Sequence, residues 1–299
     1  MKKKRSKQDV IYDTCIFIIL TFIFLIVAYP LYFIVISSIS DPKAVASGQV
    51  ILYVKGFTLR GYEEVFRNKQ VITGFLNSLF YTVCGVLLNL AVTLPTAYAL
   101  SRDKFSGKKF VTIFYMITMF VGGGMIPTYL VVKKMHMLDS MWSLIVPGAL
   151  GVYNMIVART FFKMNISEEL YDAAAIDGCG HVRFFFNIAL PISGAIIAIM
   201  VLYYGVGHWN SYFSALLYMK SDKKFPLQIV LRSILIQNQN QLAQTITSAA
   251  QQAEFERRRQ LTELMKYSLI IVSSIPVLVM YPFIQKHFVK GVMIGSIKG

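Results

Sequence analysis

Apolar residues fall into six long runs separated by polar segments that carry most of the Lys and Arg. The runs cover roughly residues 14–37, 73–100, 110–132, 141–161, 188–218 and 266–286. Crossing a hydrocarbon core of about 30 Å takes about 20 mostly apolar helical residues. Inside lipid, a helix satisfies its own backbone hydrogen bonds, whereas an irregular chain does not. The pattern therefore predicts an all-α membrane protein with six transmembrane helices.

Composition agrees with this interpretation. The 299 residues are 56% hydrophobic and only 15% charged, whereas a soluble domain has about a quarter of its residues charged. The net charge of +15 would suit a nucleic-acid partner if the cations gathered on one face. They lie between the apolar runs instead, which is typical of contact with anionic lipid. We therefore expect membrane lipid and no nucleic acid as a partner.

Basic clusters predict the orientation. They occur in residues 2–7, 101–110 and 286–298, all on one side of a six-helix chain, and short basic loops stay in the cytoplasm. Residues 257–259 are three arginines on the other side, but long loops weigh less in this rule. Both termini are expected in the cytoplasm. The first run exceeds the 7–15 residues of a signal peptide's apolar part and is interpreted as a transmembrane helix.

Two segments on the outer side are long enough to form surfaces. Residues 38–72 contain turn-forming Gly and Pro, and residues 220–265 are rich in Gln and Asn. Residues 241–266 lack Pro and Gly and predict a helix that leads into the sixth run. A solvated loop and a docking surface for an external partner are equally consistent with these segments.

The inner connection between the fourth and fifth runs predicts a short helix. Ser167 is a good N-cap, Glu168 and Glu169 suit the positive end of the helix dipole, and Gly178 suits a left-handed ending. One stripe at helical spacing contains Leu170, Ala173, Ala174 and Asp177. The small alanines would allow another chain to approach closely.

The charge of this helix favours a protein partner over lipid. It carries four acids and no Lys or Arg, and anionic headgroups would repel such a surface. The acids are Glu168, Glu169, Asp172 and Asp177.

Motifs for chemistry are absent from the sequence. It contains no GxxxxGK[ST], HExxH or GxSxG motif, and its three cysteines have no metal-ligand spacing. The six runs contain no Asp, Glu, Lys or Arg well inside them, although ion-coupled carriers need such groups. Gly122–Gly124 in the third run is expected to allow close packing or bending. We expect no catalytic residue, metal site or enzyme activity, and an energy source outside the chain.

A spaced motif identifies a family resemblance. Asp172-Ala173-Ala174, Gly178 and Ile188-Ala189-Leu190-Pro191 match the pattern E-A-A-x3-G-x9-I-x-L-P, with Asp in place of the first Glu. The chain thus resembles the permease subunits of binding-protein-dependent ABC importers, with their six-helix fold. The resemblance covers nearly the whole chain.

Other segments resemble the carbohydrate-uptake branch, the group of the smaller maltose permease subunit. They are Phe57-Thr58-Leu59 with Tyr62, the tail 281–291 and the closing residues 295–299. Residues 123–129 are similar to a subgroup that handles complex or acidic plant and algal oligosaccharides.

The resemblance implies a domain plan and partners. Residues 1–72 would form a tail, first helix and outer loop, residues 73–288 a five-helix core, and residues 289–299 a cytoplasmic tail. Within the core, residues 167–183 would contain the coupling helix that docks on an ATPase dimer. ATP and Mg would bind that ATPase, so no cofactor is expected here. A second permease and an extracellular sugar-binding protein would complete the importer in a bacterial cell membrane.

The resemblance also assigns residues to the docking site. They are Glu168, Glu169, Asp172, Ala173, Ala174, Asp177 and Gly178.

The fifth run supplies candidates for a sugar path. Sugars present apolar faces to aromatic rings and hydroxyls to amides or imidazoles, which suits His208, Trp209, Asn210 and Tyr212. For Trp209 and Tyr212, a place in an interfacial aromatic belt or in helix packing is slightly favoured over contact with sugar.

Other functions remain open at this stage. An ABC permease could carry another solute, such as a polyol phosphate or a peptide, although the C-terminal resemblance argues against a peptide. A carrier driven by ions and a membrane enzyme fit less well, because the runs lack buried acids and the chain lacks a catalytic constellation.

Overall fold

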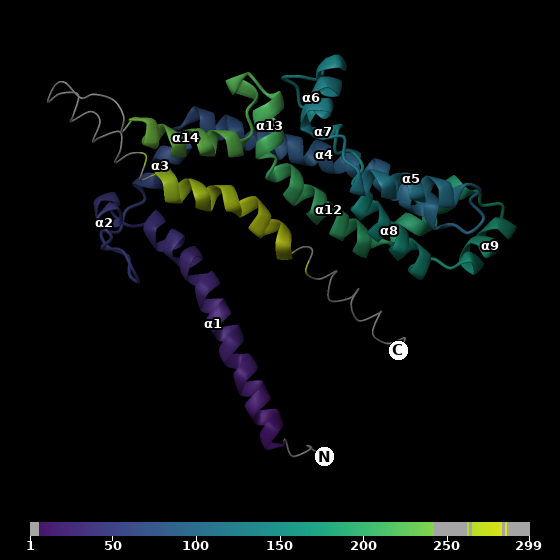
Figure 1. The fold of residues 1–299 in the computed structure, drawn as a ribbon, viewed down its shortest axis with the longest axis horizontal. Coiled ribbons are helices and arrows are strands. Elements are labelled where there is room, and N and C mark those ends of the chain that lie inside the picture. The colour runs from purple at the N-terminus through teal and green to yellow at the C-terminus, as the bar shows by residue number, and fades with distance from the viewer. Residues whose placement is uncertain (1–5, 242–261, 263–264, 283–284, 286–299) are drawn as a thin grey trace. The chain divides into compact units, whose positions relative to one another are not determined.

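The computed structural model describes residues 6–241, 262, 265–282 and 285. Every regular element in this part of the chain is a helix (Figure 1). The chain forms two compact units, Met1–Asn68 with Leu231–Ser274, and Lys69–Val230 with Ile275–Gly299. Three described helices are long and apolar enough to cross a membrane, and up to five spans result if each bent pair counts as one. The predicted tail 286–299 lies outside the described residues.

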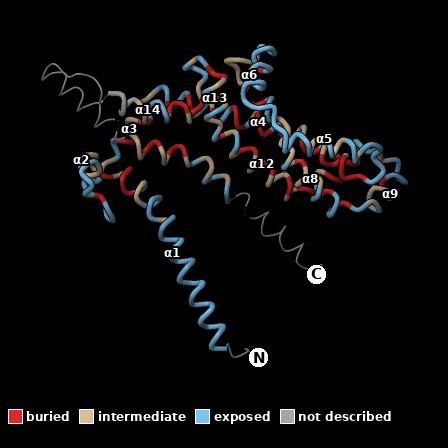
Figure 2. The backbone as a smooth tube through the Cα atoms, viewed as in Figure 1, coloured by how far each residue is buried: buried red, intermediate tan, exposed pale blue. Residues whose placement is uncertain are grey.

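The first unit begins with α1 (Lys7–Ser38), which corresponds to the first apolar run. Its N-terminus is closed by a capping box, in which the Asp9 amide donates to Ser6 Oγ and the Ser6 amide to the Asp9 carboxylate. Nearly all of α1 is exposed (Figure 2), and its buried residues lie at its C-terminal end. An apolar helix with so little cover is suited to lipid or to another membrane helix.

Two short helices and part of the last long helix complete this unit. The short helices are α2 (Pro42–Ala46) and α3 (Arg60–Arg67). In the last long helix, Met265–Pro282, the Tyr267 ring meets the Phe33 ring edge-on at 5.9 Å. The Ser268 hydroxyl donates to the Ser38 carbonyl at 3.3 Å, which closes the C-terminal end of α1.

The second unit is built around α4 (Lys69–Ser101), which packs on α8 (Val152–Asn165) and α12 (Gly194–Trp209). The contact core includes Ala97 from α4, Met155 and Phe162 from α8, and Met200 from α12, all fully buried. Figure 2 shows this core as the red segments of the three helices. Small residues alternate with large ones here, so the helices approach closely and leave few voids.

The third apolar run bends sharply. Helices α5 (Lys108–Phe120) and α6 (Met125–Lys134) meet at 114° across Gly122–Gly124. Gly124 has φ +84°, which an L side chain rarely adopts. A side chain added at Gly122 or Gly123 would meet nothing within 4 Å. Of the two roles expected for these glycines, bending is therefore the one they have.

The fourth run is also divided. Helix α7 (Trp142–Ile145) and helix α8 are joined by a turn that contains Pro147 and Gly148. Pro lacks an amide hydrogen and Gly favours turns, so the two residues end the first helix here.

The fifth run breaks where the spaced motif ends. Helix α10 (His181–Phe184), the π-helical turn η1 (Phe185–Ala189) and α11 (Leu190–Ile192) lead to Ser193, where the chain bends by 82° into α12. Pro191 cannot donate to the preceding turn, and a π-turn is a common way to absorb such a defect. Helix α13 (Tyr212–Tyr218) follows after Ser211.

The third run bends at the glycines for which the sequence allowed bending, whereas the divisions of the fourth and fifth runs were not predicted. Hydropathy alone does not register the Gly and Pro positions at which these runs divide. The number of six spans stays a prediction.

Polar side chains satisfy the backbone of the turn between α7 and α8. Asn89 of α4 donates to the Gly148 and Ala149 carbonyls at 2.7 and 2.9 Å. The Tyr204 hydroxyl of α12 accepts the Gly151 amide at 3.1 Å. These groups replace the water that the turn would bind if it were solvated.

A second tie joins the loop after α6 to the end of α13. Asp139 Oδ1 accepts the Lys220 and Ser221 amides, both at 2.9 Å, and its Oδ2 lies 3.0 Å from Lys224 Nζ. These three hydrogen bonds lower the pKa of Asp139 to about 2. The 3₁₀ turn η2 (Asp222–Lys224) and α14 (Leu227–Gln241) follow. Most of the helix predicted over residues 241–266 lies outside the described residues.

A glycine pair tests the packing of α4 on α12. A Cβ on Gly85 would lie 2.5 Å from the His208 ring, whereas one on Gly207 would meet nothing within 4 Å. Gly85→Ala is expected to displace the ring and cost about 1–3 kcal/mol, as overpacking does. Thermal unfolding in detergent should show a lower midpoint for Gly85→Ala and an unchanged or higher one for Gly207→Ala. Equal midpoints for the two variants would contradict this packing.

Candidate docking site

The predicted short helix exists as α9 (Glu168–Ile176), at one end of the second unit (Figure 1). Ser167 Oγ accepts the Leu170 amide at 3.3 Å, so the expected N-cap is confirmed. Gly178 has φ +77°, its amide donates to the Ala175 carbonyl, and the Cys179 amide donates to the Ala174 carbonyl. This is the Schellman ending that glycine permits. Nine residues give a helix of about 13 Å, too short to cross a membrane.

One side of α9 packs on its own chain. Ala174 is buried, and the half-buried Tyr171 ring stacks on His181 at 4.5 Å and meets Phe184 edge-on at 5.2 Å. Of the stripe predicted from the sequence, only Ala174 faces inward; Leu170, Ala173 and Asp177 are exposed. The stripe therefore divides between the protein's own core and solvent.

Two of the four acids contact the loop that follows α4. Glu168 Oε1 lies 3.5 Å from Arg102 Nη1 and accepts the Asp103 amide at 3.2 Å. Asp172 Oδ1 lies 2.8 Å from Lys104 Nζ, and this hydrogen bond raises the pKa of Lys104. The sequence interpretation treated the cations of this loop only as markers of orientation. Their pairing with α9 needed the tertiary structure, because more than sixty residues separate the two segments.

The loop is stabilised by a further pair. Lys108 Nζ lies 2.7 Å from Asp103 Oδ1, and this hydrogen bond lowers the pKa of Asp103. Lys108 Nζ also donates to the Arg102 carbonyl at 3.2 Å. The connection between α4 and α5 is thus folded back on itself where it meets α9.

The outward side of α9 presents acids and apolar groups together. Glu169 and Asp177 are exposed, and Ile176 between them is 88% exposed. Met164 before α9 and Val182 after it are also exposed. Exposed apolar groups beside charged ones are typical of a surface that another protein covers. Sequence analysis missed Ile176, although its place one residue before an acidic C-cap on a short polar helix was a usable signal.

The candidates for the sugar path occupy different environments. His208 Nε2 is 2.6 Å from Asn89 Oδ1, the amide that holds the turn before α8. Trp209 is 3% exposed and meets Phe75 edge-on at 5.5 Å. Asn210 is exposed, and Tyr212 is half-buried in the cluster that includes Ala215. In this conformation His208 and Trp209 face protein, and Asn210 is the candidate open to solvent.

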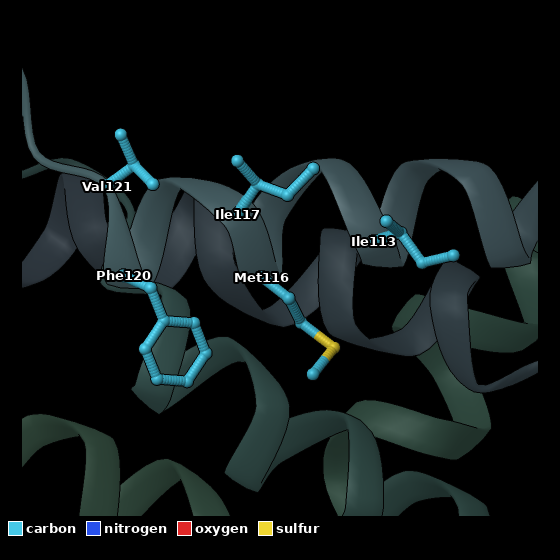
Figure 3. A pocket seen from close by; sticks show the side chains of 5 residues that line it. All are labelled: Ile113, Met116, Ile117, Phe120 and Val121. Atoms are coloured by element: carbon cyan, nitrogen blue, oxygen red, sulfur yellow. The ribbon is translucent and has the colours of Figure 1, made fainter.

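A shallow cavity lies on α5 (Figure 3). It has a volume of about 280 Å³ and is lined by Ile113, Met116, Ile117, Phe120 and Val121. Its lining offers no donor or acceptor side chain, so it is suited to apolar contact rather than to a sugar. In the part of the chain that the structure describes, no group of three His, Cys, Asp or Glu could hold a metal ion.

Known proteins resemble the chain over nearly its full length, although no protein-family model matches it. It is 36% identical to protein LplC of Bacillus subtilis (strain 168) over 294 residues, 98% of this chain and 97% of that one. It is also 36% identical to the polygalacturonan/rhamnogalacturonan transport system permease protein YtcP of the same strain, covering 97% and 99% of the two chains.

A solved structure agrees with these relatives. A chain from the crystal structure of a bacterial ABC transporter involved in the import of the acidic polysaccharide alginate matches with a TM-score of 0.86 and 28% identity. The match covers 96% of this chain and 100% of that one. Together with the identity to curated relatives, it shows that the chain belongs to the permease subunits of sugar ABC transporters.

Proposed function

We propose that this chain is the membrane-spanning permease of an ATP-driven importer of acidic oligosaccharides, and that α9 is the helix on which its ATPase acts. The observation that carries the proposal is the form of α9: a helix too short to span, closed at both ends, tied to the loop after α4 and exposing Ile176 between two acids. Such a helix transmits force well, because its ends do not fray.

The exposed surface of α9 fits a protein better than lipid. Glu169 and Asp177 would be repelled by anionic headgroups, and Ile176 would gain from burial against a protein surface. The ATPase is the partner with a reason to bind there, because the chain has no phosphate-binding loop of its own.

The contacts of α9 also support the proposed orientation. Ion pairs join it to residues 102 and 104, and positive-inside reasoning independently assigns this loop to the cytoplasm. Two segments that touch must lie on the same side of the membrane. Both termini would then be cytoplasmic in a chain of six spans within a bacterial cell membrane.

The mechanism is a rigid-body movement. Two ATPase subunits that close on ATP and Mg would draw together α9 and its counterpart on a second permease, and the attached helices would turn the path outward. A sugar-binding protein docked outside would release its ligand into that path. Hydrolysis would restore the inward state. This chain supplies the path and the docking surface and carries no cofactor.

The substrate class is inferred from similar proteins. The alginate importer handles an acidic polysaccharide, and the name of YtcP specifies polygalacturonan and rhamnogalacturonan, which also contain uronic acids. Within this chain, Asn210 and Tyr212 are the proposed contacts with sugar hydroxyls and faces. His208 and Trp209 would act from behind them, because both pack against the protein.

Gly178 tests the form of the docking helix. Its φ of +77° costs an L residue about 1–2 kcal/mol, and a β-branched residue suffers most. In proteoliposomes that contain the assembled complex, Gly178→Val is expected to preserve ATP hydrolysis and to lower sugar uptake per ATP. Gly180, with φ −72° and open space around it, is the matched control. Gly180→Val should transport normally; normal coupling in both variants would contradict the docking role.

Ile176 tests the surface that meets the ATPase. Ile176→Ser removes an exposed apolar group and is expected to weaken ATPase binding at least tenfold, because losing most of a buried side chain costs about 1.5–3 kcal/mol. The measurement is the amount of ATPase that co-purifies at increasing detergent washes. Ile51 is 57% exposed and lies in the outer segment, so Ile51→Ser should retain the ATPase fully. Equal retention by both variants would place the contact elsewhere.

The substrate class is tested by uptake. Proteoliposomes with the full complex and its binding protein are expected to accumulate labelled oligogalacturonides or oligoalginates with ATP, and neutral maltodextrins at least tenfold less. Accumulation of maltodextrin alone would keep the importer and exclude acidic sugars. Uptake without ATP would exclude the importer itself.

A further inference from the structure

Arg102 is a buried cation at the junction of three helices. It follows the last residue of α4 and is 5% exposed. Burying a charge is costly unless it is paired and hydrogen-bonded, and a guanidinium has five donors to place. Its position near the surface would allow the side chain to reach water. The Arg102 side chain turns inward instead, and this requires acceptors that hold the guanidinium there.

The acceptors come from the end of α8 and the start of α9. Arg102 Nη2 donates to the Ile166 carbonyl at 2.8 Å and lies 3.5 Å from the Phe162 carbonyl. Both carbonyls lie where α8 ends, at the negative end of its dipole, and the Phe162 carbonyl also accepts the Ile166 amide at 3.0 Å. Arg102 Nη1 lies 3.5 Å from Glu168 Oε1, in the first turn of α9. The planar fork of arginine reaches both groups at once, which the single ammonium of lysine cannot.

The guanidinium also rests on α4 itself. Its central carbon is 5.2 Å from the centre of the Tyr98 ring, close enough for a cation–π contact. The Tyr98 ring in turn meets the rings of Phe162 and Phe184. One side chain thus hydrogen-bonds the end of α8 through Nη2 and forms an ion pair with the first turn of α9 through Nη1, while it is held against α4.

Helix α9 needs such a tie because the non-helical segments on either side of it allow it to rotate relative to α8 and α4. On its N-terminal side it follows Ile166 and Ser167, both extended residues outside any helix. On its C-terminal side the chain turns at Gly178, with φ +77°. Ala174 is its only buried residue. Apart from Arg102, rotation of α9 about these two connections is resisted by the packing of Tyr171 on His181 and Phe184 and by the exposed pair of Asp172 with Lys104.

We propose that Arg102 is the positioning residue that joins α9 to the ends of α4 and α8, so that the three move as one body when the ATPase moves α9. This rests on the proposed function, in which α9 is the docking helix. Nothing in the spaced motif points to Arg102, which precedes that motif by seventy residues. The geometry predicts that losing the link separates ATP hydrolysis from transport while leaving the ATPase bound.

A purely structural role would be different. In that role only the hydrogen bonds of Arg102 to the Phe162 and Ile166 carbonyls would matter, and they would close the C-terminus of α8. Glu168→Gln distinguishes the two roles, because it removes the charge that attracts Arg102 to α9 and leaves the bonds to α8 intact. Arg102→Lys keeps the charge but loses the fork.

The experiment uses the assembled complex in proteoliposomes, with labelled oligogalacturonide as the transported probe. Three quantities are measured for wild type, Arg102→Lys and Glu168→Gln: ATPase subunits per complex, ATP hydrolysis, and probe taken up per ATP. Arg102→Lys is expected to retain the ATPase and to hydrolyse ATP within about twofold of wild type. Uptake per ATP is expected to fall at least tenfold in each. Lys104→Ala is the matched control, because it removes the exposed pair between the same loop and α9; it should stay within twofold.

The outcomes separate the possible roles. Unchanged uptake per ATP in both variants overturns the proposal, and so does an effect of Arg102→Lys without one of Glu168→Gln, which would leave only the α8 closure. Loss of the ATPase from Glu168→Gln would make Glu168 a docking contact and also overturn it. A wild-type complex that retains no ATPase would instead exclude the proposed function.

Discussion

Backbone groups freed where helices break must find partners inside the protein, and in the second unit α4 and the residue after it supply several of those partners. Asn89 bonds the turn before α8, Arg102 bonds the end of α8, and Asn77 donates to the carbonyls of Lys223 and Phe225. Within the lipid-covered part no water is available to replace such bonds. The turn before α8 and the segment after η2 therefore depend on polar side chains of one long unbroken helix.

This arrangement explains how an apolar chain can carry buried polar groups at little cost. Asn89 is fully buried, yet its amide donates to two carbonyls and its oxygen meets His208. Thr93 pairs with Tyr204, whose hydroxyl also accepts the Gly151 amide. Each group completes another's bonding, so removing one member leaves the others unsatisfied. Such networks favour one arrangement of α4, α8 and α12 over alternatives that are equally apolar.

The acids of α9 fall into two groups, those that contact the protein's own cations and those that face outward. Glu168 and Asp172 meet cations of the protein's own loop, whereas Glu169 and Asp177 face outward. The pair of buried Arg102 with half-buried Glu168 is screened less by salt than the exposed pair of Asp172 with Lys104, which contributes little stability. The four acids of one short helix thus have two different environments. One set holds the helix to the membrane core, and the other remains available to a partner.

The sequence by itself determined the class of protein, the long helices α1 and α4, and α9 with both of its ends. These features are local: apolar length, an N-cap at Ser167 and a left-handed Gly178 each act within a few residues. The tertiary structure decided which runs break, that Trp209 packs on Phe75, and that Arg102 reaches α8 and α9. The packing of Trp209 and the contacts of Arg102 depend on partners far away in the chain, and the breaks occur at Gly and Pro positions that hydropathy does not register. A buried arginine and an exposed one have the same letter, and only packing distinguishes their surroundings.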